Sequence, residues 1–324
     1  MRRKIIKLKF VDLYPGFVPE HSALFKVISR NYDIHLCDNP DYIIAQPYGH
    51  EHLRYDCIKI FFTGENMTPD FNLCDYAIGF DHLSFGDRYL RVPLWAIRSN
   101  FSSFRMQSEP SDEDLLNRGF CSFVVSNSRG DPMRTRFLKE LSKYKKIDSG
   151  GCYMNNVGGP VKDKLKFIAG YKFNIAFENS AYPGYTTEKI MDPLSVWSVP
   201  VYWGDPLVDH DFRKESMVRV CSTDDIDAAI DEIIRLDKND AEYLKKCREQ
   251  CLVIKDKNFY MDKLEEFMVN IFEQPIDAAR RTSRYGYQGV FYRAWQKKAF
   301  AAYDLVNAPM NFCRKVRRSL HIGR

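Results

Sequence analysis

Residues 171–206 constrain the fold of this chain more than any other segment. They read YKFNIAFENSAYPGYTTEKIMDPLSVWSVPVYWGDP. Phe173–Phe177 and Val199–Trp203 are short apolar runs typical of buried strands, and a polar and aromatic loop and a helix that begins near Thr187 separate them. This order predicts a βαβ unit, whose two strands lie parallel in one sheet.

The helix of this unit begins with Thr-Thr-Glu-Lys, so Lys189 places a cation in its first turn. The free N–H groups and the positive end of the helix dipole already attract anions there. A lysine at this end therefore costs stability unless an anion lies nearby. We interpret the turn as a phosphate-binding site.

Length and cysteine content limit the architecture. A chain of 324 residues exceeds the usual single-core size of ~250–300 residues, so two domains are expected. The nine cysteines form no Cys-x-x-Cys pair, and Cys247 and Cys251 have no nearby histidine. Neither a zinc site nor a disulfide framework is indicated, and reduced thiols in a cytosolic protein are the simpler interpretation.

The charge is divided between a body and a tail. Eleven of the 48 Lys and Arg residues but only one of the 43 acids lie from Arg280 onward, which leaves residues 1–279 with a net charge of −5. The first residues, MRRKIIKLKF, contain no apolar run of the kind that a signal peptide or a membrane span needs. We therefore expect a cytoplasmic protein whose basic character belongs to its tail.

Apolar runs and the segments between them predict two α/β domains with mostly parallel sheets. In the first pattern, strands are expected at 5–13, 34–37, 42–45, 58–62, 76–80 and 89–94, and a helix at 21–30. In the second pattern, further strands are expected at 121–125 and 217–220, and helices at 132–144, 161–170, 224–236, 241–252 and 261–272. The polar segment 98–114 is the best linker candidate. Ligands of such sheets bind at the carboxyl ends of the strands.

Two further segments accompany the βαβ unit. They are FFTGENMTPDFNLCDYAIGFDHLSFGDRYLRVPLW (61–95) and SFVVSNSRGDPMRTRF (122–137). In this order the three segments resemble the bacterial α1,3/4-fucosyltransferases, glycosyltransferase family 10, over about half of the chain. The resemblance implies a GT-B-type fold, with two Rossmann-like domains facing across a cleft and additional C-terminal helices. It also implies transfer of L-fucose from GDP-β-L-fucose with inversion.

Glu65 is the candidate catalytic residue. It follows the strand at 58–62, and it matches the position of the family's proposed general base. Such a carboxylate takes the proton of the acceptor hydroxyl while that oxygen attacks C1 opposite the leaving nucleotide. The alternative is a carboxylate that caps a turn or pairs with Arg88 or Arg91.

Arg134 and Lys189 match the arginine and the lysine that bind the nucleotide diphosphate in the family. Departing GDP gathers negative charge, which fixed cations stabilise. A forked arginine and a point-charge lysine suit two linked phosphates. Arg136 competes with Arg134 for this role, Arg129 does so more weakly, and a solvated helix arginine is the alternative for Arg134.

Asn179, Tyr185 and Glu188 match further positions that contact the donor in the family. From the residues alone, Tyr185 fits a packed wall equally well, and Glu188 fits an ordinary acid at a helix N-terminus. Asp209 and Asp211 form an Asp-x-Asp pair, but at a place where the family has no metal ligands. We therefore expect no required metal or other cofactor, and Mn²⁺ or Mg²⁺ would stimulate only by binding the released nucleotide.

The tail contains RYGYQGVFYRAWQKKAF (284–300). At helical spacing, an apolar stripe with Arg293 and Lys297 opposite is expected to comprise Phe291, Trp295, Ala299, Ala302 and Val306. A basic aromatic helix is typical of binding to anionic lipid, at ~1 kcal/mol per nearby cation. The alternative is a helix packed on the protein's own body, and nucleic acid is not expected because no base-reading motif is present. The tail also lacks the leucine-rich heptads of some bacterial relatives.

The sequence thus predicts an acceptor-binding domain at 1–115, a GDP-fucose-binding domain at 116–279 and a basic amphipathic tail at 280–324. The resemblance implies fucose addition to O3 of GlcNAc in a glycan such as N-acetyllactosamine, or α1,4 addition on a type 1 chain. It favours a bacterial enzyme of surface polysaccharide, peripheral on the inner face of the cytoplasmic membrane. The alternatives are a GT-B transferase with another nucleotide sugar and a non-catalytic membrane-associated glycan- or nucleotide-binding protein.

Overall fold

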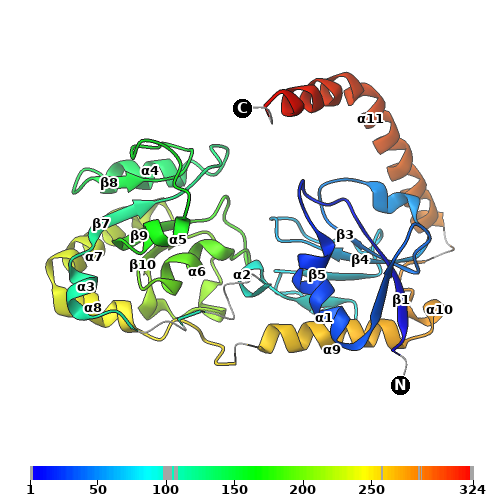
Figure 1. Ribbon diagram of the computed structural model, residues 1–324, viewed down its shortest axis with the longest axis horizontal. Coiled ribbons are helices and arrows are strands. Elements are labelled where there is room, and N and C mark those ends of the chain that lie inside the picture. The colour runs from blue at the N-terminus through cyan, green and yellow to red at the C-terminus, as the bar shows by residue number, and fades with distance from the viewer. Residues whose placement is uncertain are drawn as a thin grey trace. The chain divides into compact units, whose positions relative to one another are not determined.

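The chain forms two compact units, each built around one sheet (Figure 1). The computed structural model describes residues 3–97, 104–105, 109–256, 258–283, 285 and 287–321, the end of the last helix by its backbone alone. The first unit comprises Met1–Ile78, Phe85–Leu90 and Glu265–Arg324, and the second comprises Gly79–Ser84 and Arg91–Leu264.

The first sheet has six strands in the order β2-β1-β3-β4-β5-β6. In chain order they are β1 (Ile5–Val11), β2 (Asp33–Leu36), β3 (Tyr42–Ala45), β4 (Ile58–Phe62), β5 (Tyr76–Gly79) and β6 (Tyr89–Arg91). The described pairings of β1 to β5 are all parallel. The central strands β3, β4 and β5 consist largely of buried residues, as expected for a parallel sheet covered on both faces.

Helices α1 (Ala23–Asn31) and α9 (Phe259–Glu273) pack together against one face of this sheet (Figure 1). The ring of Phe272 makes edge contacts with Tyr32 and Tyr42, at centroid distances of 5.4 and 4.8 Å. Arg30 pairs with Glu265 at 2.8 Å. Residues 265–279, which the sequence pattern assigned to the second domain, therefore belong to the first unit, together with α10 (Ile276–Ala279).

The last helix, α11 (Tyr287–His321), packs on the first unit through a face that the sequence pattern did not select. The Tyr292 hydroxyl donates to Asp70, Phe300 stacks on His50 with the ring centroids 4.7 Å apart, and Asp304 pairs with the same histidine. These positions lie eight and four residues apart, both multiples of four, so they share one side of the helix.

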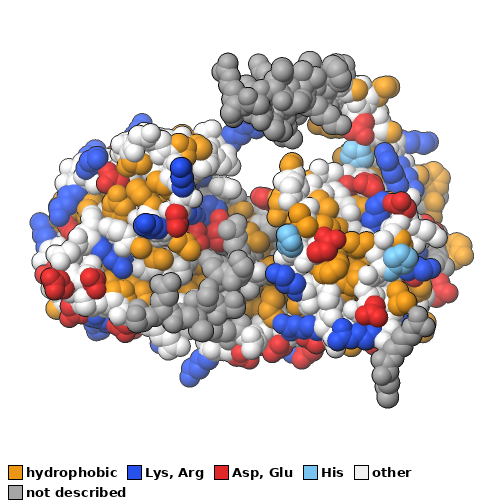
Figure 2. All heavy atoms as spheres, viewed as in Figure 1, with side chains coloured by type: hydrophobic (Ala, Val, Ile, Leu, Met, Phe, Trp, Pro, Cys, Tyr) orange, Lys and Arg blue, Asp and Glu red, His pale blue; other side chains and the backbone are white. Residues whose placement is uncertain are grey.

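The predicted apolar stripe of α11 is largely exposed. Phe291, Trp295 and Val306 are 58%, 62% and 76% accessible, and Figure 2 shows hydrophobic side chains on the visible part of the helix. Packing on the protein's own body and an exposed apolar face therefore occur in the same helix. No helix in the described part of the chain is both long enough and apolar enough to cross a bilayer.

The second sheet has five strands in the order β11-β10-β9-β7-β8, and its pairings are parallel. The strands are β7 (Gly119–Phe123), β8 (Ile147–Ser149), β9 (Tyr171–Phe177), β10 (Val199–Trp203) and β11 (Val218–Arg219). The helices are α4 (Met133–Leu141), α5 (Lys164–Ile168), α6 (Glu188–Ser195), α7 (Ile226–Lys238) and α8 (Asp240–Arg248). The predicted βαβ unit is confirmed as β9-α6-β10.

A continuous apolar core supports this sheet. It includes Phe123, Phe137, Phe173 and Phe177, and α7 contributes Ile226 and other residues of its inner face. Two short helices, α2 (Leu94–Ile97) and α3 (Asp112–Leu116), precede the sheet, and α3 lies in part within the predicted linker. Residues 98–103 and 106–108 of that linker lie outside the described residues.

Counted from the first strand of each unit, both sheets have the order 2-1-3-4-5, and the first sheet adds a sixth strand. This is a doubly wound order, in which the connections change direction between the first and third strands. The predicted α/β class with two Rossmann-like sheets is confirmed. The crevice at that point of each sheet is the expected ligand site.

Candidate active site

A cavity of about 360 Å³ lies at the carboxyl ends of β7, β8 and β9 in the second unit. The segment 124–127 leaves β7, Gly150 and Gly151 leave β8, and Asn179 follows β9. The first turn of α6 adds Glu188 and Lys189. Three of the predicted donor residues, Asn179, Glu188 and Lys189, therefore line one cavity at the switch point of the sheet.

Lys189 already has an anionic partner in the protein. Its Nζ donates to Glu178 Oε2 at 3.0 Å, and Glu178 is fully buried at the end of β9. The Thr187 amide and hydroxyl also donate to this carboxylate. Glu178, which the sequence analysis did not single out, thus supplies the anion that a lysine at a helix N-terminus requires.

Burial and pairing act in opposite directions on these two groups. Burial raises the pKa of Glu178, although the Lys189 ammonium and the donors of Thr187 oppose that rise. Burial also disfavours the charge of Lys189, but the Glu178 and Glu188 carboxylates together outweigh it and raise the pKa of the lysine. Lys189 therefore stays cationic at the cavity wall, where an added anion would share it with Glu178.

Arg134 lies behind the cavity rather than on its wall. It is 1% accessible, and it donates to Asn179 Oδ1 at 3.1 Å and to the Asn127 carbonyl at 2.9 Å. Its Nε has no hydrogen-bond partner among the described residues, and burial lowers its pKa. A methyl group added to Gly130 would lie 1.7 Å from Arg134 Nη2, so a larger residue there would displace the guanidinium. Arg134 thus holds two of the residues that line the cavity.

The other candidate residues differ clearly in burial and in position relative to the cavity. Tyr185 is buried, and its ring packs edge-on against Phe80 at 5.2 Å, so its side chain is part of a packed wall. Arg129 and Arg136, the competitors of Arg134, are exposed. Lys164, which the sequence analysis did not select, lines the cavity and pairs with Asp192 at 2.5 Å.

Two features of this site could have been read only in part from the sequence. Ser126 and Asn127 directly follow the predicted strand at 121–125, and polar residues at a strand end are a signal of a ligand site. Gly151 is required because an added Cβ would lie 2.0 Å from the Val125 carbonyl oxygen. That close approach depends on β8, a three-residue strand that the sequence did not reveal.

Glu65 lies in the first unit, in the turn after β4. Its amide donates to Thr63 Oγ1 at 3.0 Å, and the Tyr48 hydroxyl donates to its carboxylate at 2.6 Å. The side chain is exposed to solvent. Neither suggested arginine pairs with it: Arg88 donates to main-chain carbonyls, and Arg91 pairs with Asp211.

A cavity of about 470 Å³ adjoins this turn within the first unit. Tyr48 and Met67 line it beside Glu65, and His50 and Asp70 contribute polar groups. Residues of α11 complete its wall: Gln296, Phe300 and Tyr303. Its lining combines aromatic faces with polar groups, Lys59 among them, which suits a sugar ring.

The Asp-x-Asp pair is occupied by protein contacts. Asp211 is buried, accepts two bonds from Arg91 and also binds Tyr260 and Trp95. Asp209 pairs with Arg219. Within the described ranges, no three His, Cys, Asp or Glu side chains are grouped as a metal site would need.

Two parallel sheets of one strand order, one with a cationic cavity at its switch point, define a GT-B-like glycosyltransferase architecture. Residues 8–98 match the model of the α-(1,3)-fucosyltransferase FucT N-terminal domain, and residues 117–262 match that of the glycosyltransferase family 10 (fucosyltransferase) C-terminal domain. The chain belongs to glycosyltransferase family 10, the fucosyltransferases.

Individual relatives support this assignment. The chain is 36% identical over 280 residues to the α-(1,3)-fucosyltransferase FucT of Helicobacter pylori, an alignment that covers 74% of this chain and 58% of that protein. It is 34% identical over 139 residues to α-(1,3)-fucosyltransferase B of Drosophila melanogaster, covering 38% of this chain and 31% of that one. The chain thus spans less than two thirds of the length of these relatives.

A solved structure extends the likeness to the fold. The crystal structure of an α1,3-fucosyltransferase with GDP-fucose matches with a TM-score of 0.73 and 31% identity. The match covers 85% of this chain and 92% of that one. The predicted family and GT-B-like fold are confirmed.

Proposed function

We propose that this protein is an inverting α1,3-fucosyltransferase that uses GDP-β-L-fucose as donor. The observation that carries the proposal is the cationic cavity at the switch point of the second sheet, in a chain of family 10. The related crystal structure contains GDP-fucose, and a diphosphate is the anion that Lys189 and the α6 N-terminus would stabilise.

In this proposal the second unit binds the donor. Lys189 contacts the diphosphate while Glu178 keeps it cationic and in place. Arg134 orients Asn127 and Asn179, and it reaches the diphosphate itself only after its two present contacts rearrange. Glu188 and Asn179 line the cavity and contact the nucleotide sugar, and Tyr185 supports the wall.

The first unit binds the acceptor in the same proposal. Glu65 takes the proton of the attacking hydroxyl, and Tyr48 orients its carboxylate. The cavity beside them holds a GlcNAc-containing glycan such as N-acetyllactosamine, which receives fucose at O3. The reaction requires no metal ion, and Mn²⁺ or Mg²⁺ acts only on released GDP.

A donor screen tests the proposal. The full chain is incubated with N-acetyllactosamine and, in parallel, GDP-fucose, GDP-mannose, UDP-galactose or UDP-glucose, and products are identified by mass spectrometry and NMR. We expect transfer from GDP-fucose alone, with the new linkage at O3 of GlcNAc. Transfer from another donor points to a different GT-B transferase, and no turnover with any donor points to a binding protein.

We further propose that α11 attaches the protein to the inner face of a bacterial membrane. Its exposed Phe291, Trp295 and Val306 would enter the headgroup region, and the tail's cations would add ~1 kcal/mol each near anionic lipid. Cosedimentation with phosphatidylglycerol vesicles should fall in Trp295→Glu, and phosphatidylcholine vesicles should bind weakly. Equal binding by the variant would contradict the proposal.

A further inference from the structure

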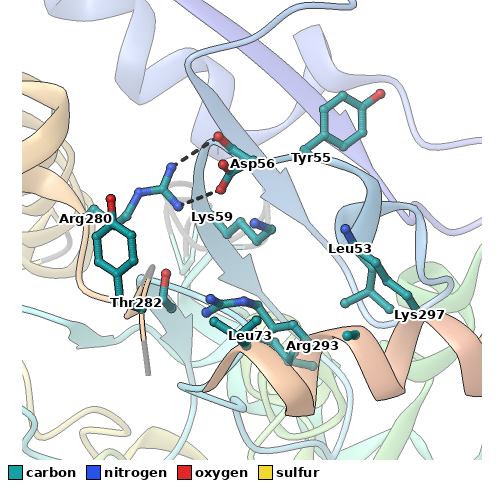
Figure 3. Close-up of a pocket in the computed structure, with 12 residues that line it drawn as sticks. Leu53, Tyr55, Asp56, Lys59, Leu73, Arg280, Thr282, Arg293 and Lys297 are labelled. Carbon is teal, nitrogen blue, oxygen red and sulfur yellow. Dashed lines mark hydrogen bonds and ion pairs between the residues drawn. The ribbon is translucent and has the colours of Figure 1, made fainter. Parts of the chain in front are cut away.

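A second cavity of the first unit, about 520 Å³ in volume, lies between β4 and the start of α11 (Figure 3). Its charged lining is unequal: four cationic side chains face one carboxylate. The cations are Lys59, Arg280, Arg293 and Lys297, and the acid is Asp56. Arg280 and Asp56 pair with each other at 3.0 Å, which leaves three cations in excess.

Lys59 is the informative member of this group. It lies on the central strand β4, is only 7% accessible and points into the cavity (Figure 3). Within the described residues its Nζ has no hydrogen-bond or ion-pair partner, because nearby Asp75 accepts instead from the main chain of Lys59, Arg281 and Thr282. A largely buried lysine without an ion-pair partner is unfavourable, and burial lowers its pKa although the nearby Asp75 and Asp56 carboxylates oppose that decrease. Such a group indicates that an external anion belongs beside it.

The other cations approach from a different element. Arg293 and Lys297 lie one turn apart on α11 and reach the cavity from the side opposite β4 (Figure 3). Forked and point-charge donors that converge on one space suit a tetrahedral anion with several oxygens. Leu53, Leu73 and Val290 add apolar lining, which suits the carbon part of a phosphate-bearing molecule. The volume of about 520 Å³ has room for more than a bare ion.

We propose that this cavity is a binding site for a phosphate group, carried either by a soluble ester or by a lipid headgroup. It is separate from the donor cavity, which belongs to the second unit, and it shares Lys59 and Leu73 with the neighbouring cavity beside Glu65. Binding neutralises Lys59 and joins α11 to the sheet, so the anion also stabilises the docked helix. The proposal does not depend on fucosyl transfer.

Isothermal titration calorimetry of the full chain tests the proposed phosphate site. GDP is kept at saturation so that the donor cavity is filled. The probes are inorganic phosphate and short-chain dioctanoyl phosphatidic acid. We expect binding of at least one probe, weakened tenfold or more in Lys59→Met and several-fold in Lys297→Met. The matched control is Lys298→Met, the neighbouring exposed lysine of α11 that lines neither cavity. Binding of phosphate identifies a soluble source as sufficient, and binding of phosphatidic acid alone identifies the lipid.

Thermal unfolding gives a second, independent readout. Lys59→Met should raise the Tm of the ligand-free protein, because it removes an unpaired buried charge, and it should lose the Tm increase that the probe causes in the wild type. Lys297→Met, a change at an exposed side chain, keeps the test valid if Lys59→Met does not fold. Absence of binding by both probes, or equal affinity in these variants and in Lys298→Met, overturns the proposal.

Discussion

The two sheets share the strand order 2-1-3-4-5 but differ in how the protein pairs the buried cations around them. In the second unit, the buried charges have internal partners: Lys189 bonds Glu178, and Arg134 bonds Asn127 and Asn179. In the first unit, Lys59 has no partner in the described part of the chain. The same topology therefore supports a site whose cations the protein itself holds in place and a site whose lysine lacks such a partner.

The loops follow the same division. Buried Asp205 fixes the loop between β9 and α6 by accepting from the Gly184 amide, the Thr186 hydroxyl and the Leu207 amide. Exposed Glu65 is held by its turn and by one bond from Tyr48. A donor pocket with fixed groups suits one constant nucleotide, and a less constrained carboxylate suits acceptors that enter and leave.

The sharpest test of this division is Glu65→Gln. If the first unit supplies the base and the second the donor site, transfer should fall ~10²–10⁴-fold, which is the usual contribution of a general base. GDP affinity, measured by calorimetry, should stay within about twofold. Glu20→Gln, at an exposed acid of the same unit, is the control and should keep full activity. A Glu65→Gln enzyme with near wild-type kcat would remove the catalytic role from this residue.

The division could be predicted from the sequence only where the signal was local. The strands at 42–45, 58–62 and 199–203 match at both ends, because each is a short run of mostly apolar residues. The strand β8 (Ile147–Ser149) was missed because it is short and lies at the sheet edge. Helix α3 was missed although its capping box, Ser111 with Asp114, is a readable signal within the polar segment.

Long-range partners could not be predicted. Lys189 was recognised as a cation in need of an anion, but a carboxylate eleven residues earlier is recognisable as its partner only once β9 and α6 are packed together. The same limit affected α11, where helical spacing showed an apolar stripe. The surface that the helix meets offers His50 and Asp70, so the face with Tyr292 and Phe300 packs instead.

Lys189→Met breaks the internal pairing of the second unit. Removing one partner leaves Glu178 buried and uncompensated, so unfolding in urea should show a loss of about 3–5 kcal/mol. Adding Glu178→Gln should recover most of this stability, because the buried charge disappears. GDP affinity should remain about tenfold weaker in both variants. Equal stability of the single and double variants would show that Glu178 is not charged in the folded protein.

Gly130→Ala perturbs the same unit by a steric clash and leaves its charges unchanged. The added methyl group would occupy the place of the Arg134 guanidinium, which must shift and release Asn127 and Asn179. Overpacking of this kind costs about 1–3 kcal/mol, and GDP binding should weaken with it. Gly170→Ala is the control, because an added methyl group there would lie at an ordinary distance of 3.4 Å from the Phe167 carbonyl oxygen. Unchanged GDP affinity in Gly130→Ala would mean that the position of Arg134 does not matter to the donor.

Asp12 tests the switch point of the first sheet, where the smallest effect is expected. It follows β1 and accepts from the Glu51 amide, the His52 amide and the His52 ring. Burial opposes its charge, but the bonds from His52 and Glu51 prevail and lower its pKa below the usual value. A carboxylate with a lowered folded-state pKa stabilises the protein above its unfolded-state pKa, near 3.8, and loses that contribution as the pH falls further.

Asp12→Asn should therefore cost about 1.5 kcal/mol at pH 7 in urea unfolding, and the difference from wild type should shrink below pH 4. A difference that persisted unchanged at pH 3 would mean that the carboxylate charge contributes nothing, and that the first switch point is stabilised by shape alone.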